Sequence, residues 1–565
     1  MKKLSVFLVV ALLMTSLVNI QIVSAESNYD YSTALKYSLY FFDANKCGPE
    51  AGVNNYYDWR SACHVEDGSE EGLDLTGGYH DAGDHVKFLL PQAYAASTLA
   101  WSLYEYKDVY ESTGNKGQMI STLKYFTDFL LKCYAKPGNF YYQVGDGQDD
   151  HTYWGAPEEQ PGTRPVPYVA NASNPGSDVL GMTSASLTLM YLNYKSIDAS
   201  YANKCLEVAK ELYEMGKSNP GKYKEAAFYQ SHSYWDDLAW AAAWLYVVEK
   251  DAKYLSEIDS YLSNKTYLGQ SPFENKWTMC WDDMYMAVFC KMAALTGEQK
   301  YKDAMDYNLN HWKTTLTTTP GGLKHLDTWG SLRYVSAECM IALLYYEQTK
   351  DESLKSFAKS QIDYALGNNP NNMSYLIGFG SKYPLHPHHR GANGYTYANG
   401  DNAKPAKHLL TGALVGGPDA TDAYRDDVNQ FQYTEVAIDY NASFVGGIAG
   451  IVRYYGNMPQ VPSPTPTEIG PTPTKDALKW CDVGDLNVDG SINAGDYTLL
   501  RRFLLGVTKK LPYQEVPEIL IPAGDVDGNG KINAGDYTIM RRYILNIIDE
   551  FPVEYDIEGN IIRNN

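Results

Sequence analysis

Residues 236–248 read DDLAWAAAWLYVV, and this stretch decides the fold class. Its apolar side chains recur every three or four residues, which is the spacing of one face of an α-helix. The positions that carry the pattern are Leu238, Ala241, Ala242, Leu245 and Val248. A half-buried strand would instead alternate apolar and polar residues. The stretch therefore predicts a helix that two aspartates open.

The same spacing recurs elsewhere in the chain. It is found at Met284, Val288 and Ala294 in one segment and at Met340, Leu343 and Leu344 in another. Alternating strand patterns are few, so we expect an all-α domain of repeated helix pairs over residues 26–457. Long loops rich in Gly, Pro, Trp and His interrupt the helices at 137–176 and 367–434. Functional sites are commonly built on such loops.

The composition narrows the possible functions. The chain has 565 residues and 44% of them are hydrophobic, which is enough for a large core and more than one domain. Its formal net charge of -21 repels phosphate backbones and anionic lipid. We therefore expect no nucleic-acid partner and no membrane partner. The 49 tyrosines suit ring stacking against flat ligands, although core packing also explains such an excess.

The two ends of the large domain have distinct compositions. Residues 1–25 have the lysines, apolar run and small-residue cleavage site of a secretory signal peptide. We therefore expect a secreted, extracellular protein. Residues 458–478 are rich in Pro and Thr and predict an extended linker. A smaller domain follows at 479–558.

The eight cysteines are scattered, and no Cys-x-x-Cys pair is present. This spacing argues against a disulfide framework and against a structural zinc site. We expect buried thiols that are free or singly paired.

The smaller domain contains a repeat, because residues 485–496 match residues 525–536. Each copy places oxygen ligands in the pattern of a calcium loop, with glycine at the sixth position. The predicted calcium ligands are Asp485, Asn487, Asp489, Ser491 and Asp496, and Asp525, Asp527, Asn529, Lys531 and Asp536. Ser491 and Lys531 would contribute only their backbone carbonyls. The pattern predicts two bound Ca²⁺ ions.

One amphipathic segment follows each loop, at 499–504 and 539–544, and Pro522 argues against a helix before the second loop. A duplicated loop-then-helix unit behind a Pro/Thr linker resembles a type I dockerin of cellulosome-forming bacteria. The resemblance implies that this domain binds a cohesin module of a scaffoldin. Loop positions 10 and 11 are Ala-Gly in both copies rather than the commoner Ser-Thr, which leaves the preferred cohesin open.

Three clusters in the large domain carry the residue types of acid–base chemistry. Asp81 and Asp84 lie in the glycine-rich segment 77–88, and paired carboxylates can hold and deprotonate a water molecule. Taken alone, this pair is equally consistent with a helix cap or a metal site. Glu435 has apolar and aromatic neighbours that could raise its pKa, although a solvent-facing glutamate is the simpler interpretation. The histidine-rich segment 386–390 favours hydrogen bonding to sugar hydroxyls over metal ligation.

Taken together and in this order, these segments resemble glycoside hydrolase family nine. The segments that carry the resemblance are 81–84, 145–154, 329–333, 363–370, 383–390 and 435–442. The resemblance implies an (α/α)6 barrel and an inverting endo-β-1,4-glucanase. It implies that Asp84 is the catalytic base, that Asp81 helps to hold the nucleophilic water, and that Glu435 is the catalytic acid. An inverting enzyme keeps its two carboxyl groups about 6.5–9.5 Å apart to leave room for that water.

The resemblance also implies residues that bind substrate and metal. The implied substrate-binding residues are His151, Trp154, Trp329, His388, Arg390 and Tyr440. The implied ligands of one calcium in the large domain are Asp236, Asp237 and Asp283. The chain departs from the family at His232-Ser233, where Ser-Gly is usual, and at Thr434, where Asn commonly precedes the acid.

We expect an endo-acting enzyme that cuts accessible β-1,4-glucan chains without moving processively along crystals, because no fused cellulose-binding module is evident. Two alternatives stay open. One is a family member that acts mainly on xyloglucan or mixed-linkage β-glucan. The other is a catalytically silent, sugar-binding scaffold component.

Overall fold

The computed structural model describes residues 29–456 except 225–227 and 267. In the C-terminal part it describes residues 483–487, 492, 494–504, 508–515, 522–544, 548, 551–555 and 561–564. The predicted signal peptide and linker lie outside the described residues, as do Asp489 and Ser491. The chain forms two compact units, 1–461 and 462–565. Among the described helices, none combines the length and apolar character needed to cross a membrane.

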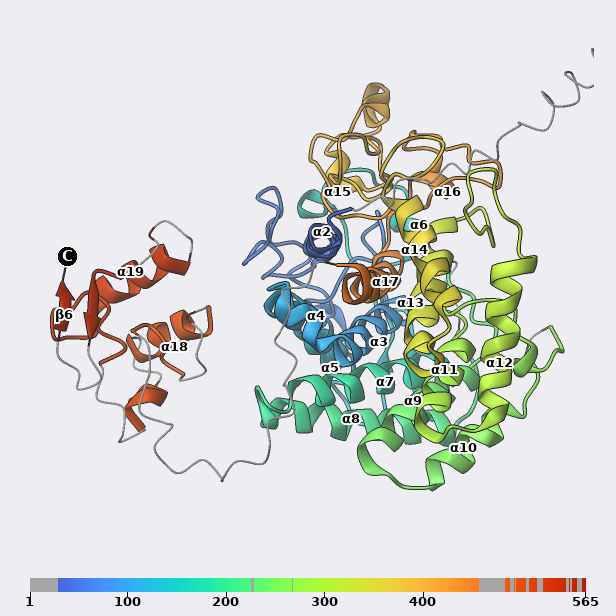
Figure 1. Cartoon of the computed structure of the whole chain (residues 1–565), viewed down its shortest axis with the longest axis horizontal. Coiled ribbons are helices and arrows are strands. Elements are labelled where there is room, and N and C mark those ends of the chain that lie inside the picture. Colours follow the sequence, from blue (N-terminus) through green and yellow to red (C-terminus); the bar gives the residue numbers. More distant parts are fainter. Residues whose placement is uncertain are drawn as a thin grey trace, which may run out of the picture. The chain divides into compact units, whose positions relative to one another are not determined.

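Six helices form a closed inner ring in the first unit (Figure 1). They are α3 (Leu89–Glu105), α7 (Ser177–Tyr194), α9 (Trp235–Glu249), α11 (Tyr285–Thr296), α13 (Ser331–Thr349) and α17 (Ile438–Tyr455). Each packs against the next, and α17 returns to pack against α3. In α9, every residue from Asp236 to Leu245 is buried, because the inner helices are covered on all sides.

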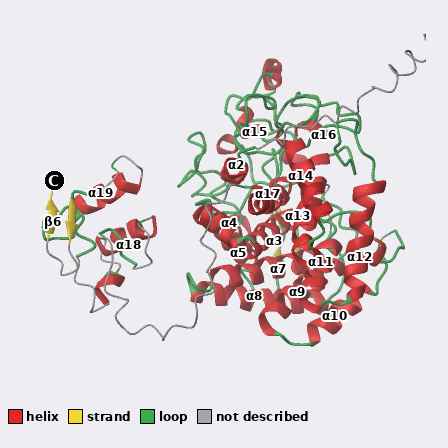
Figure 2. Cartoon of the chain, in the orientation of Figure 1, coloured by secondary structure: helices red, strands yellow, loops and turns green. Residues whose placement is uncertain are grey.

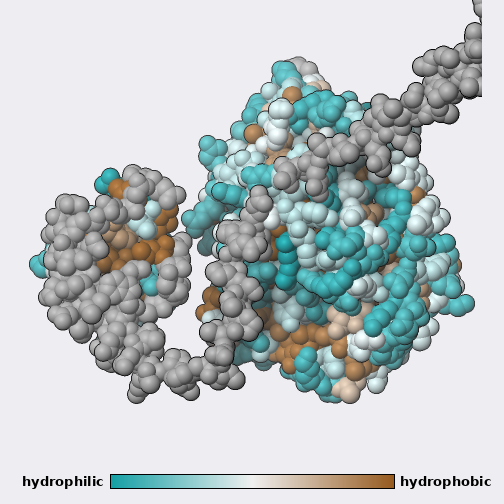
Figure 3. Space-filling view, viewed as in Figure 1, coloured by the Kyte–Doolittle hydropathy of each residue, from teal (hydrophilic) through white to brown (hydrophobic). Residues whose placement is uncertain are grey.

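Six further helices cover this ring from outside. They are α2 (Tyr31–Asn45), α5 (Lys116–Cys133), α8 (Ala199–Ser218), α10 (Lys253–Leu262), α12 (Gln299–Asn310) and α14 (Glu352–Leu366). These helices are more amphipathic: α8 buries Ala202, Cys205, Ala209 and Leu212 along one face. Their outer faces give the unit a mostly hydrophilic surface in Figure 3, with a hydrophobic patch toward the bottom of the view. The predicted all-α fold and (α/α)6 barrel are confirmed.

The two kinds of connection differ in length. Turns from an inner helix to the following outer helix are short, as at 195–198, 250–252 and 350–351. Connections from an outer helix to the next inner helix are long, and they cover residues 46–88, 134–176, 219–234, 263–284, 311–330 and 367–437. Because neighbouring helices are antiparallel, the long connections gather at the end of the barrel where the inner helices begin.

The long connections contain small elements of their own, and Figure 2 shows extensive loops around α15 and α16. The short helices of the first unit are α4 (Lys107–Ser112), α6 (Gly147–Asp150), α15 (Arg390–Asn393) and α16 (Phe431–Thr434). The 3₁₀ and π segments are η1 (Ser69–Glu71), η2 (Pro157–Glu159), η3 (Pro272–Glu274), η4 (His311–Thr315) and η5 (Ala398–Ala403). The strands are β1 (Lys87–Phe88) antiparallel to β3 (Gln143–Val144), and β2 (Phe140–Tyr141) antiparallel to β4 (Val169–Ala170).

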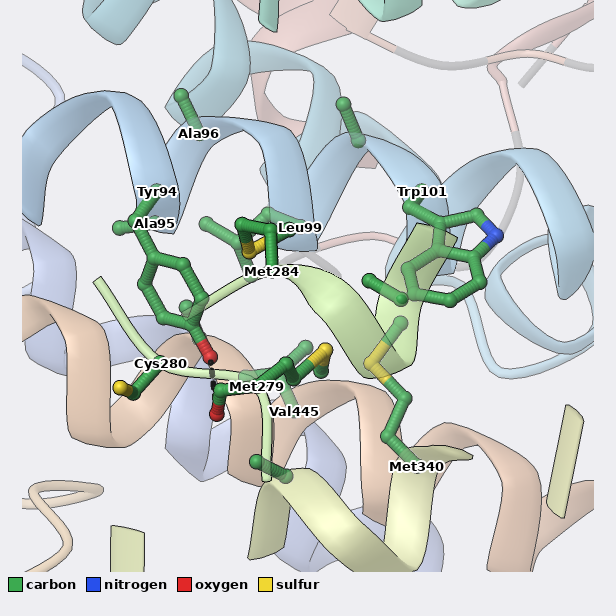
Figure 4. Close-up of a cluster of buried hydrophobic side chains, with 14 of the residues drawn as sticks. Tyr94, Ala95, Ala96, Leu99, Trp101, Met279, Cys280, Met284, Met340 and Val445 are labelled. Carbon is green, nitrogen blue, oxygen red and sulfur yellow. Dashed lines mark hydrogen bonds between the residues drawn. The ribbon is translucent and has the colours of Figure 1, made fainter. Parts of the chain in front are cut away.

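The barrel centre is filled by large side chains from the inner helices. Trp101 packs its edge against Trp240, with ring centroids 4.9 Å apart, and Trp240 packs similarly against Trp244 at 5.4 Å. In Figure 4, Tyr94 reaches across this core and donates a hydrogen bond to the carbonyl of Met279. All seven described cysteines are buried and free, as the sequence predicts.

The second unit is small. Its helices are α18 (Ala494–Leu504) and α19 (Ala534–Ile544), which pack together with Tyr497 stacked on Tyr537. Each helix follows one predicted calcium loop. The described elements also include η6 (Pro512–Glu515) and the antiparallel pair β5 (Val553–Tyr555) and β6 (Ile561–Asn564). Buried side chains such as Leu486, Leu500 and Met540 form its core.

Gly181 in α7 provides a test of how closely the inner helices pack. A Cβ atom at this position would lie 2.8 Å from the backbone of Asp237 in α9, which cannot move without shifting the helix. We expect Gly181→Ala to destabilise the first unit by about 1–3 kcal/mol, as overpacking of a core does.

The matched control for Gly181→Ala is Gly117→Ala in α5. Apart from the backbone of its own helix and its chain neighbours, no atom of the described residues lies within 4 Å of the Cβ position there, so this variant should be neutral or slightly stabilising. Differential scanning calorimetry of the three proteins measures the effect. Equal melting temperatures for Gly181→Ala and Gly117→Ala would contradict the close approach of α7 and α9.

Candidate active site and metal centres

The loop that carries Asp81 and Asp84 is joined to two other segments of the site. A Cβ atom on Gly83 would lie 1.9 Å from the carbonyl oxygen of His388, so only glycine allows this approach. The backbone N–H of Arg390 donates to the carbonyl of Gly83 at 3.0 Å. The N–H of Ile438, at the start of α17, donates to the carbonyl of Asp81 at 3.0 Å. These contacts bring the three clusters predicted from the sequence to one end of the barrel.

Asp81 is buried, and one of its carboxyl oxygens accepts a hydrogen bond. The hydroxyl of Tyr229 donates to its Oδ2 atom, while its Oδ1 atom has no hydrogen-bond partner among the described residues. Burial raises the pKa of Asp81 well above its ordinary value, and the charges of Asp84 and Asp439 add to the effect. Tyr229 was not found by sequence reasoning, because it lies 148 positions from Asp81 and in none of the motifs.

Asp84 is the second carboxyl of this loop. Its Oδ1 atom accepts the backbone N–H of Ala82 at 3.1 Å. The pKa of Asp84 is raised to about 6, first by burial and then by the charge of Asp150, while the charge of Arg390 opposes the rise. Asp84, Asp150 and His151 have ligand atoms within 4.8 Å of one another. At neutral pH a carboxyl with this pKa is ionised and can accept a proton.

Glu435 lies between α16 and α17. The indole N–H of Trp329 and the hydroxyl of Tyr440 both donate to its Oε2 atom, at 2.7 and 2.9 Å. Its backbone pairs with that of His388 in a parallel bridge. Thr434 donates its hydroxyl to the carbonyl of Asp427 at 3.0 Å. Two donors on one oxygen fix the orientation of the Glu435 carboxyl group.

A further buried carboxyl, Asp439, lies four residues after Glu435 in the first turn of α17. Its Oδ2 atom lies 3.6 Å from a terminal nitrogen of Arg333. The guanidinium of Arg333 also lies over the ring of Tyr440 at 5.1 Å. Burial raises the pKa of Asp439 to about 6, with Arg333 opposing the rise. Asp439 and Arg333 therefore lie beside the hydrogen-bonded group that holds Glu435.

The residues implied for sugar binding fall into two sets. Trp329 is 44% exposed and packs against Phe431, while His151 is exposed and stacks on Phe228. Trp154 packs its edge against His388, and its indole N–H donates to Asn393 at 2.9 Å. Trp154 is itself buried, as are Arg390 and Tyr440. Arg390 lies behind the surface of the site, where it pairs with Asp150 at 2.6 Å.

Of the aspartates expected to bind calcium in the large domain, Asp236 and Asp237 are buried and Asp283 is half-buried. The Oδ1 atom of Asp236 has no hydrogen-bond partner among the described residues. Burial and the neighbouring carboxyls raise the pKa of Asp237 well above its ordinary value. Asp283 accepts hydrogen bonds from Asn275 and from the N–H of Tyr285. Among the described residues, the ligand atoms of Asp236, Asp237 and Asp283 do not all lie within 4.8 Å of one another. The unpartnered Oδ1 atom of Asp236 and the negative charge of the three side chains nevertheless suit a hard cation such as Ca²⁺.

The second predicted calcium loop is assembled in the small unit. Ligand atoms of Asp525, Asp527 and Asp536 lie within 4.8 Å of one another. Asn529 follows Asp527 in the same turn and donates its N–H to Asp525 and Asp527, each at 3.0 Å. Lys531 donates its own N–H to Asn529 at 3.0 Å. These carboxylates provide the oxygen ligands that Ca²⁺ prefers.

In the first loop of that unit, the described ligands have a similar arrangement. Asp485 and Asp496 are buried, and the N–H groups of Leu486 and Asn487 donate to Asp496 at 2.8 and 3.2 Å.

One candidate metal-binding set was missed by sequence reasoning. Cys47, Cys63, His64 and His80 have ligand atoms within 4.8 Å of one another. Nδ1 of His64 lies 3.5 Å from the sulfur of Cys47 and 3.1 Å from Nε2 of His80. A hydrogen bond from Cys47 lowers the pKa of Cys63 to about 7, which favours the thiolate. We call these four residues the cysteine–histidine cluster.

Two thiols and two imidazoles are the donor set of a tetrahedral zinc site. The four residues therefore form a candidate zinc site, which the cysteine spacing did not predict. The fold brings these four residues together although they come from three separate stretches of the chain and contain no Cys-x-x-Cys pair. A Cys-His pair at 63–64 was the available signal in the sequence.

Comparison with known proteins agrees with this geometry. Residues 31–448 match glycosyl hydrolase family 9, and residues 523–561 match the dockerin type I domain. Endoglucanase A of Bacillus pumilus is 40% identical over 455 residues, which cover 76% of this chain and 67% of that protein.

Solved structures are similar over the same region. The cellulase Cel9M of C. cellulolyticum in complex with cellobiose is 60% identical, with a TM-score of 0.75 over 76% of this chain and 99% of that chain. Endoglucanase CelQ of Clostridium thermocellum complexed with cellotriose is 36% identical, with a TM-score of 0.69 over 78% of this chain and 73% of that one. The chain therefore belongs to glycosyl hydrolase family 9 as an endoglucanase, and it carries a type I dockerin domain.

Proposed function

We propose that this chain hydrolyses internal β-1,4-glucosidic bonds of cellulose with inversion at the anomeric carbon. The observation that carries the proposal is that the site contains two carboxyl groups in different surroundings. Asp84 is buried beside Asp150 with its pKa raised to about 6, whereas Glu435 is half-buried and oriented by Trp329 and Tyr440. Two carboxyl groups in different surroundings are what an acid–base pair requires.

In the proposed reaction Glu435 acts as the general acid. It gives its proton to the glycosidic oxygen as the bond from that oxygen to the anomeric carbon breaks. Trp329 and Tyr440 both bond to Oε2, which leaves Oε1 of Glu435 as the oxygen available to face the leaving group. Positioning of this kind is a precondition for efficient proton transfer.

Asp84 acts as the general base on the opposite face of the sugar ring. It accepts a proton from the water molecule that attacks the anomeric carbon. Asp81 holds the same water through its Oδ1 atom, which has no partner among the described residues, while Tyr229 fixes Oδ2. At the end of the step the water has become the anomeric hydroxyl, and inversion follows because attack and departure occur on opposite faces.

Sugar rings would be held by exposed rings around these carboxyl groups. Trp329 and His151 offer accessible faces, and Trp154 with His388 forms the adjoining wall. Arg390 and Tyr440 support the site from behind through Asp150 and Glu435. The cellobiose and cellotriose complexes of the two related structures agree with a β-1,4-glucan substrate.

We further propose that the enzyme is exported and endo-acting, and that it joins a cellulosome. The dockerin domain would bind a cohesin module once its two loops hold Ca²⁺, with Asp525, Asp527 and Asp536 among the ligands. Asp236, Asp237 and Asp283 would hold one more calcium near the start of α9.

An NMR time course on cellopentaose tests the proposed reaction. We expect the α-anomer of the new reducing end to appear first, since the water attacks opposite the departing oxygen.

We expect Asp84→Asn to lower kcat by at least about 10²-fold, because a general base contributes that much. Early β-anomer would exclude inversion. Binding of cellopentaose without any product would favour a catalytically silent, sugar-binding scaffold component. Faster turnover of xyloglucan or mixed-linkage β-glucan than of cellulose would favour a family member that acts mainly on those polysaccharides.

The pH dependence of kcat/KM tests the role of Asp84. The base must be ionised, so activity should fall as the pH drops below about 6, where Asp84 takes up a proton. Rates on cellopentaose between pH 4 and 8 measure this acidic limb. A limb near pH 4, the ordinary range of an aspartate, would show that another group is the base.

Calcium removal tests the dockerin. We expect a chelator, or the double substitution Asp485→Ala with Asp525→Ala, to abolish binding to a type I cohesin, because each loop loses its first carboxylate. Hydrolysis of cellopentaose by the double variant should stay unchanged, since both substitutions lie in the unit that does not contain the proposed catalytic residues. Isothermal titration calorimetry measures the binding. Undiminished cohesin binding by the double variant would rule out the two loops as the calcium sites.

A further inference from the structure

Gln160 lies between the cysteine–histidine cluster and the catalytic loop. Its Oε1 atom lies 2.9 Å from Nε2 of His64 and 3.0 Å from Nδ1 of His85. Its amide nitrogen donates to Oδ1 of Asp150 at 2.8 Å. One amide group therefore contacts a member of the cluster, a histidine of the catalytic loop and the carboxylate beside Asp84.

These contacts fix the direction of each hydrogen bond. A carboxylate can only accept, so the amide nitrogen of Gln160 faces Asp150 and its oxygen faces the histidines. His64 must then carry its proton on Nε2, which leaves Nδ1 with a free lone pair. Nδ1 is the atom that faces Cys47 and His80. Gln160 thus holds His64 in the tautomer that can ligate a metal.

Asp150 is held equally firmly on its other side. Its Oδ2 atom accepts from Arg390 at 2.6 Å and from the backbone N–H of His85 at 3.3 Å. It is buried, and its ligand atoms lie within 4.8 Å of those of Asp84. Gln160 and Arg390 therefore keep the carboxyl group of Asp150 in a fixed place beside the proposed base.

We propose that Gln160 is a positioning residue that couples the cysteine–histidine cluster to the proposed base Asp84 through Asp150. This inference rests on the proposed function only for the role of Asp84. Gln160 does not touch the reacting atoms. It orients His64 on one side and Asp150 on the other, so loss of its amide disturbs both neighbours together.

The charges that face Asp84 decide the direction of the effect. These groups are Asp81 and Asp150, which disfavour its ionised form, and Arg390 and His151, which favour it. When Asp150 is displaced, Asp84 loses a repelling charge and ionises at lower pH. The acidic limb of the pH profile should therefore move downward, which a merely structural defect would not produce.

Gln160→Leu tests the proposal in the full chain, because leucine keeps the bulk of the side chain and removes its hydrogen bonds. We expect kcat on cellopentaose to fall about 10-fold or more, as loss of a metal's supporting contact typically does. The acidic limb of kcat/KM should shift downward, and Asp150→Asn should shift it in the same direction by roughly one unit. Gln148→Leu is the matched control, since Gln148 is exposed on neighbouring α6.

Zinc binding gives a second measurement that needs no activity. Competition of Zn²⁺ with a chromogenic chelator should show about 10-fold weaker binding by Gln160→Leu than by the wild type or Gln148→Leu. Unchanged zinc affinity together with an unchanged acidic limb would overturn the proposal. A wild-type chain without hydrolytic activity would count against the proposed function, and the zinc titration would still decide the coupling.

Discussion

The site depends on one constraint, which is that all six inner helices begin at the same end of the barrel. Short turns close the opposite end, so every long connection must cross the end where the inner helices start. Helix N-termini carry partial positive charge and favour nearby carboxylates. Asp178, Asp236 and Asp439 occupy the first turns of α7, α9 and α17. The barrel therefore provides a setting in which an unusual number of buried carboxyl groups can lie together.

Gly83 fixes how closely two of these loops approach each other. The backbone of the Asp81–Asp84 loop lies directly on that of the His388 segment, and no side chain could fit between them. The His388 segment in turn pairs with Glu435. The proposed base and acid are thus connected through a few backbone hydrogen bonds. Mobile side chains contribute little to this connection, which limits how far the two groups can drift apart.

A feature could be predicted from the sequence when its residues lie close together along the chain. The helix at 236–248 and the calcium loops were predictable because their patterns lie within a few residues. The carboxyl groups Asp81, Asp84 and Glu435 could be proposed from the sequence because each lies within a long motif. Tyr229 and Gln160 belong to no local pattern, and only the packing of separate loops gives them partners. The cysteine–histidine cluster is similar, since its residues come from three separate stretches of one long connection.

The two proposed catalytic carboxyl groups share a form of support. Behind Asp84 lies the pair Asp150–Arg390, and beside Glu435 lies the pair Asp439–Arg333. In each case the arginine binds the supporting aspartate and not the catalytic group. A direct arginine contact would stabilise the ionised form strongly, and a proton could then be neither delivered by the acid nor accepted readily by the base. With an aspartate in between, the arginine does not bind the proposed catalytic carboxyl, while its positive charge still offsets the buried negative charge of the site.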